Sequence, residues 1–125
     1  MKNTSKVSPS IILSLSALLS FQVFAGTKST YNVSATATSI SGSFGSARNS
    51  SDTKQTLHIG DTGTTATIWA RNSAGTIKSC TTNNAAHLAA LRSATSNSYL
   101  LASHSSGKCT YVNVYKGSLF APKVL

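Results

Sequence analysis

The sequence predicts an α+β domain in which one helix covers a small antiparallel sheet. Five segments carry the alternating or β-branched pattern of strands, and one segment between the third and the fourth carries a helical pattern. Two cysteines, Cys80 and Cys109, fall in the third and the last of these strands. The predicted order is therefore β-β-β-α-β-β, with one helix and one disulfide.

The first three strands are predicted at 55–59, 65–70 and 76–80. Polar and apolar residues alternate in the first, and the second is rich in β-branched residues and contains Trp69, which we expect in the core. The intervening segments 60–63 and 72–75 contain glycine beside aspartate or asparagine, which is typical of turns. Short turns join antiparallel neighbours, so these strands should form a meander.

A short amphipathic helix is predicted at 85–94, where alanine and leucine predominate. Asn83 or Asn84 can cap its first turn, because an asparagine side-chain oxygen accepts a free helix N–H. Leu88 and Leu91 lie three residues apart and therefore share the face that packs on the sheet. The last two strands are predicted at 99–103 and 109–115, with a turn at 105–107.

The first 25 residues have the pattern of a secretory signal peptide. Lys2 and Lys6 precede an apolar run at 11–19, and Ala25 supplies the small residue at the cleavage point. The run is shorter than the about 20 residues that span a bilayer. We expect an exported protein, periplasmic or extracellular, with no transmembrane anchor.

Residues 26–53 are rich in serine, threonine, alanine and glycine, so we expect a flexible or weakly structured N-terminal segment. Within it, 31–35 alternates weakly and suggests an edge strand, whereas 39–51 is predicted to be a loop. Residues 54–125 should form the small disulfide-stapled domain.

Cys80 and Cys109 are predicted to pair, because an exported protein meets oxidising surroundings. The alternatives are a metal-binding pair and a redox pair. A structural metal site normally needs four ligands and a redox pair normally has a Cys-x-x-Cys spacing, and the sequence shows neither.

The chain is strongly basic, with 11 Lys and Arg, 2 Asp and Glu, and a net charge of +9. Such a field favours anionic partners such as nucleic acid or an acidic polysaccharide, although it also serves solubility alone. The basic residues are scattered along the chain rather than clustered.

Several kinds of catalytic site are poorly supported. No Gly-x-Ser-x-Gly motif marks a serine hydrolase, and a glycosidase acid pair would have only Asp52 and Asp61 to draw on. The histidines His58, His87 and His104 lack a paired metal-binding spacing, so we expect no metal and no cofactor.

A small basic ribonuclease-like enzyme is the sharpest catalytic alternative. Two histidines can act as base and acid while a lysine stabilises phosphate. His58, His104 and Lys108 would supply these groups if the fold brought them together.

The last predicted strand suggests a recognition surface instead. Tyr111 and Tyr115 lie four residues apart and share one strand face, while Val112 and Val114 take the other. The lysines Lys108 and Lys116 flank this stripe, and Arg71 and Lys78 are candidates for further charge support. The alternative is ordinary cross-strand packing of the tyrosines.

Several groups of residues together resemble a family of small exported proteobacterial proteins without an assigned activity. The shared positions span about 45–123 and are Ser46-Ala47-Arg48-Asn49-Ser50, Asp52, Gln55, Ile59-Gly60, Ala70-Arg71, Gly75, Cys80, Ser98-Tyr99-Leu100, Gly107, Cys109, Val114 and Ala121-Pro122-Lys123. The resemblance implies a Gram-negative exported setting and brings no catalytic residues.

One departure from this family is informative. Its members often carry a second cysteine pair, where this chain has Asp61 and the Ile68-Trp69 dipeptide. Loss of both cysteines together supports the pairing of Cys80 with Cys109, and it predicts adjacent strands at Asp61 and Ile68. The element order also resembles the OB-fold barrels of bacterial toxin B subunits, so an OB-like barrel is the alternative architecture.

Taken together, the sequence favours a secreted or periplasmic non-catalytic binding protein. Its expected partner is an anionic polymer, a glycan or a secreted protein. The alternatives are the ribonuclease-like enzyme and a structural component of the cell surface.

Overall fold

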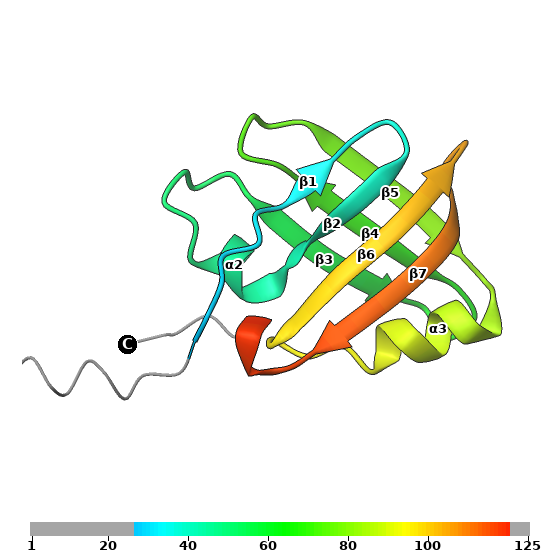
Figure 1. The fold of residues 1–125 in the computed structure, drawn as a ribbon. Coiled ribbons are helices and arrows are strands. Elements are labelled where there is room, and N and C mark those ends of the chain that lie inside the picture. The colour runs from blue at the N-terminus through cyan, green and yellow to red at the C-terminus, as the bar shows by residue number, and fades with distance from the viewer. Residues whose placement is uncertain (1–26, 121–125) are drawn as a thin grey trace, which may run out of the picture.

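A computed structural model describes residues 27–120 of the chain, and the predicted signal peptide lies outside these residues. Ten elements follow one another (Figure 1): β1 (Ser34–Ala35), β2 (Ser39–Ser43), α2 (Phe44–Arg48), β3 (Thr56–Asp61), β4 (Ala66–Arg71), β5 (Ile77–Thr82), α3 (Ala85–Arg92), β6 (Ser98–Ser105), β7 (Lys108–Lys116) and the 3-10 helix η2 (Ser118–Phe120). No described helix is long and apolar enough to cross a membrane.

The strands form one seven-stranded sheet in the order β1-β2-β6-β7-β5-β4-β3. All neighbours are antiparallel except β5 and β7, which run parallel and meet at the single pair Thr81–Lys108. The α+β class and the five predicted strands are confirmed. The sheet has seven strands and is mixed, so the expectation of a small, purely antiparallel sheet is corrected. The prediction of adjacent strands at Asp61 and Ile68 is also confirmed, since β3 and β4 pair, although Asp61 itself is opposite Ala66.

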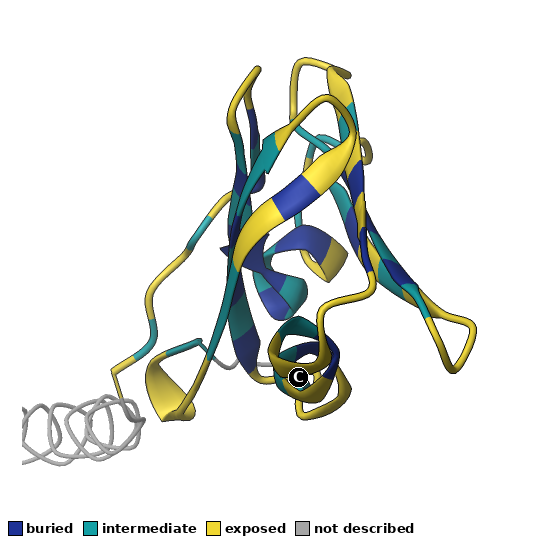
Figure 2. Cartoon of the chain, turned by 90° about the vertical axis from the view of Figure 1, so that its right-hand side faces the viewer, coloured by how far each residue is buried: buried dark blue, intermediate teal, exposed yellow. Residues whose placement is uncertain are grey.

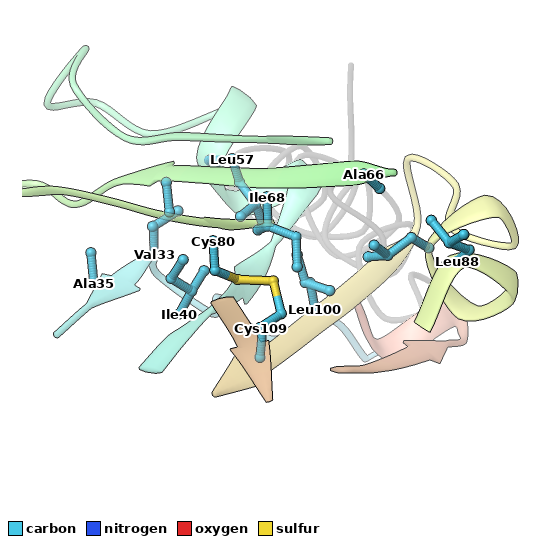
Figure 3. Close-up of a cluster of buried hydrophobic side chains, with 14 residues drawn as sticks. Val33, Ala35, Ile40, Leu57, Ala66, Ile68, Cys80, Leu88, Leu100 and Cys109 are labelled. Atoms are coloured by element: carbon cyan, nitrogen blue, oxygen red, sulfur yellow. A yellow bond between two sulfur atoms is a disulfide. The ribbon is translucent and has the colours of Figure 1, made fainter. Parts of the chain in front are cut away.

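The sheet is bent into two layers that face each other across the core. Strands β1, β2, β6 and β7 form one layer and β3, β4 and β5 form the other (Figures 1 and 3). Buried residues occupy the facing sides (Figure 2), and Ile40, Ile68 and Leu100 are fully buried. Among the described strands no pair joins the edges β1 and β3, so the OB-like barrel is not confirmed.

A disulfide joins the two layers where their hydrogen bonding is weakest. Cys80 on β5 and Cys109 on β7 are bonded, with their Cα atoms 5.1 Å apart, as the sequence predicts (Figure 3). Both are buried in the core, so the bond crosses the interior beside the single β5–β7 pair.

The prediction of a loop at 39–51 is wrong for 39–48, where β2 and α2 lie, and holds only for 49–51. Strand β2 pairs with β6 along its whole length, and Ile40 and Gly42 face the core side. Ser43 caps helix α2, because its hydroxyl accepts the N–H of Ser46, and the helix packs on β2, β3 and β6. Residues 33–48 therefore belong to the folded layer rather than to a weakly structured segment.

Helix α3 closes one end of the space between the layers, as Figure 1 shows. Asn84 is the residue that caps it, since its side chain accepts the N–H groups of Ala86 and His87. Leu88 and Leu91 are buried, as the predicted apolar face requires. The helix ends at Arg92, two residues before the predicted end.

Candidate functional site

Strands β6 and β7 present a continuous outer face on the side away from the core. In β6, Leu100 and Ala102 are buried, and the residues that alternate with them, Tyr99, Leu101 and Ser103, are half-buried. The register pairs Tyr99 with Tyr115 and Ser103 with Tyr111, so these four residues share the outer side. Val112 and Val114 pack against the core, which confirms the predicted division of β7 into two faces.

The tyrosines of β7 are accessible and their hydroxyls are fixed. Tyr111 is 47% exposed and Tyr115 is 43% exposed. The side-chain amide of Asn113, between them, donates to the Tyr111 hydroxyl at 3.1 Å and to the Tyr115 hydroxyl at 3.0 Å. One amide therefore holds two phenol rings along one strand.

Further aromatic residues extend this surface at the end where β7 finishes. The ring of Tyr99 lies 5.8 Å from that of Tyr115 and 5.5 Å from that of Phe120. Tyr31 completes the group, with its ring centroid 5.2 Å from both Tyr99 and Phe120. We call Tyr31, Tyr99, Tyr111, Asn113, Tyr115 and Phe120 the aromatic face.

Sequence reasoning identified only Tyr111 and Tyr115 of the aromatic face and missed its other four residues. Tyr31 comes before β1, and its backbone oxygen accepts the N–H of Ser43 at 3.1 Å. Phe120 lies in η2, beyond the predicted strands. Neither residue has a local pattern that connects it to β7, so only the tyrosine spacing within that strand was a usable signal.

The two predicted lysines lie at opposite ends of the aromatic strand. Lys108 begins β7 and Lys116 ends it, which separates their Cα atoms by roughly 26 Å along the strand. Both are exposed. Lys116 pairs with the buried Ser98 and follows Tyr115, so alternation places it on the opposite side of β7 from the tyrosines. The two lysines therefore form no cluster on the aromatic face.

Arg71 and Lys78 lie on the other layer and do not support the aromatic face. Arg71 occupies an outward position at the end of β4, and its Nε donates to the backbone oxygen of Lys54 at 2.6 Å. Lys78 pairs with Ala70 across β4 and β5. The predicted set of six binding residues is thus divided between two surfaces.

The proposed ribonuclease residues are also divided. His58 lies on β3, where its ring stacks on Trp69 with centroids 4.9 Å apart and planes 7° apart. His104 lies on β6 of the other layer, and its Nε2 donates to the Thr36 oxygen at 3.1 Å. Lys108 lies near His104 in the β6–β7 hairpin, but the fold does not bring His58 to them.

Trp69 is half-buried on the outer side of β4, not in the core as expected. Its neighbours Ile68 and Ala70 are the buried residues, so alternation turns the indole outward. The stacked imidazole of His58 covers part of it.

Both aspartates make internal bonds. Asp52 accepts the N–H groups of Lys54 and Gln55 and the Gln55 amide, and these bonds lower its pKa to about 2. Asp61 accepts Arg92 Nε at 2.6 Å and the Gly63 N–H at 2.8 Å, which lowers its pKa to about 2 as well. A catalytic acid that works near neutral pH requires a raised pKa, and neither aspartate has one.

The described residues include no group of three or more His, Cys, Asp or Glu that could hold a metal ion. Comparison with protein-family models, with curated proteins and with solved structures finds no match to this chain. The functional argument therefore depends on the aromatic face and on the charge around it.

Proposed function

We propose that this chain is an exported, non-catalytic binding protein whose aromatic face holds an acidic polysaccharide. The observation that carries the proposal is the row of half-exposed tyrosines on β7, with hydroxyls fixed by Asn113. Export is supported by the signal-like leader in the sequence and by the Cys80–Cys109 disulfide.

The chemistry of the aromatic face suits sugar rings. A tyrosine offers an apolar ring and a hydroxyl, so it can cover the C–H side of a sugar while it hydrogen-bonds a sugar hydroxyl. Because Asn113 fixes the two hydroxyls of β7 before a ligand arrives, little ordering of these side chains would oppose binding. Two serines lie on the outer side of the neighbouring strands, Ser103 opposite Tyr111 and Ser41 opposite Leu101.

Charge favours an acidic ligand. The chain contains only two acidic side chains, Asp52 and Asp61, and neither lies on the strands of the aromatic face. A negatively charged polymer therefore meets no repulsion from a carboxylate side chain at this surface, while the net charge of +9 attracts it.

The spacing of the lysines favours a sugar polymer over a nucleic acid. Single-stranded nucleic acid carries a phosphate at every nucleotide, and its binding grooves track that backbone with positive charge. Here Lys108 and Lys116 mark only the two ends of β7. A polymer with sparser carboxylates and many hydroxyls fits this arrangement better.

The test is titration of the oxidised protein with a soluble polyuronate, a neutral glucan and a single-stranded oligonucleotide. Replacement of Tyr111 and Tyr115 by alanine should weaken polyuronate binding at least roughly tenfold. Ile77→Ala is the matched control, because Ile77 is an apolar residue of the other layer that is 49% exposed. Unchanged binding in the double variant, or preference for the oligonucleotide, would overturn the proposal.

A further inference from the structure

Strand β3 is an edge of the sheet with backbone groups left free. It pairs only with β4 among the described strands. The Thr62 N–H donates to the Thr65 oxygen at the hairpin end, and bonded pairs alternate along an antiparallel ladder. The N–H and C=O groups of Leu57 and Ile59 therefore point away from β4, and the hydrogen bonds of residues 27–120 give them no other partner.

This edge lacks most of the features that usually protect an edge strand. Natural edges are kept short, carry charged residues, proline or a bulge, or are covered by a helix or loop. Strand β3 is charged only at Asp61, and α2 packs beside it but no hydrogen bond of residues 27–120 joins the two. The opposite edge, β1, has only two residues, whereas β3 has six, with the sequence Thr-Leu-His-Ile-Gly-Asp and a regular register to β4. An edge of this length with free backbone groups is available for pairing with another strand.

A hollow of about 430 Å³ lies beside β3 and would receive the side chains of such a strand. It is lined by β3, by α2 and by the end of α3 with the turn that follows. Its apolar lining comes from Phe44, Leu57, Ile59, Leu91 and Ala94. A strand added to β3 would present alternate side chains towards this lining.

The charges at the hollow favour an acidic occupant. Arg48 is exposed at its rim, and no hydrogen bond or ion pair of the described residues occupies its guanidinium. The carboxylate at the rim, Asp61, is already bound to Arg92. A second copy of the chain would bring its own net charge of +9, so like-charge repulsion disfavours that occupant.

We propose that β3 is a docking edge for an extended acidic peptide of a partner protein, separate from the aromatic face. The peptide would bond to the free N–H and C=O groups of Leu57 and Ile59 and place apolar side chains in the hollow. Its acidic side chains would lie within reach of Arg48.

The first experiment uses fluorescence anisotropy of a labelled peptide in which glutamate alternates with valine. The same peptide with N-methyl groups at alternate amides is the probe control, because it cannot donate to an edge strand. Arg48→Glu should weaken binding of the unmodified peptide about tenfold or more, since it replaces an attraction by a repulsion. Lys54→Glu, the same charge change at an exposed site outside the hollow, should leave binding unchanged.

The second readout is amide hydrogen exchange. Leu57 and Ile59 amides should exchange freely in the protein alone and become protected in the complex, while Tyr111 and Tyr115 should be unaffected. Equal binding of the N-methylated peptide, absence of binding, or protection of Leu57 and Ile59 by protein self-association alone would overturn the proposal.

Discussion

At the scale of single residues, one carboxylate organises the join between the N-terminal strands and β3. Asp52 binds the backbone of Lys54 and the backbone and amide of Gln55. The Gln55 Oε1 in turn accepts the Val33 N–H at 2.8 Å. A turn at 52–55 is therefore tied directly to the residue that precedes β1.

Acid should destabilise the fold through Asp52 and Asp61. The folded pKa of each is about 2, below the value of about 3.9 in an unfolded chain. Their contribution is complete above the unfolded pKa and is lost as pH falls from about 5 to about 2. The urea midpoint of unfolding, measured across this range, should fall.

The control is the double variant Asp52→Asn, Asp61→Asn. The chain has no other acidic side chain, so the midpoint of this variant should change much less between the same pH values. An equal fall in both proteins would contradict the assignment.

Gly42 is required where β2 passes Val33. Its φ is +150°, and an added Cβ would lie 3.0 Å from the Val33 Cα. Gly42→Ala should lower the free energy of unfolding by about 1–3 kcal/mol, measured in urea. Gly60→Ala is the matched control, because an added Cβ at Gly60 would have open space and the φ of Gly60 is not positive. An equal loss of stability in this control would argue against the close approach of Gly42 to Val33.

At the scale of elements, local pattern predicted β3, β4, β5, α3, β6 and β7 but not β2 or α2. The predicted elements have alternation, β-branched residues or helix formers within their own sequence. Strand β2 is Ser-Ile-Ser-Gly-Ser, and its pairing with β1 and β6, rather than local propensity, gives this segment its conformation. Helix α2 contains Gly45 and Ser46, and burial of Gly45 and Ala47 stabilises it rather than helix propensity.

The same reasoning applies to the candidate site. Spacing alone placed Tyr111 and Tyr115 on one face, because strand alternation is a local rule. Tyr31 and Phe120 reach that face from opposite ends of the described chain, so no local rule connects them.

Loss of the disulfide should weaken the junction of β5 with β7 more than other strand pairs. Cys80 and Cys109 are 29 residues apart, and closing such a loop stabilises a fold by about 3–4 kcal/mol in the chain-entropy model. The variant Cys80→Ala, Cys109→Ala should lose about this much in urea unfolding. Its amide exchange should increase first near Thr81 and Lys108, which form the single β5–β7 pair; a uniform increase across all strands would contradict this.

At the scale of the whole molecule, the excess of positive charge should make ligand binding depend on salt. Polyuronate affinity should fall as salt is raised from 0.05 to 0.5 M, because screening shortens the reach of exposed charges to about 10 Å or less at 0.1 M and above. The variant Lys108→Glu, Lys116→Glu should bind more weakly and depend less on salt. Lys54→Glu, away from β7, is its control, and salt-insensitive binding would contradict an electrostatic contribution.

The two-layer arrangement could not be predicted from the sequence. Alternation shows which side chains face the same way within a strand, but not which strands oppose one another. The two layers are joined at the parallel β5–β7 pair and at the disulfide beside it, and both connect residues that are distant in sequence.

The pairing of β2 with β6 also sets the order in which the chain can fold. Hairpins connect β3, β4 and β5, so this meander can form as soon as its own residues are present. Ile40 pairs with Ala102, and among the described strands β1 pairs only with β2. The N-terminal strands therefore cannot complete their pairing until β6 has been synthesised.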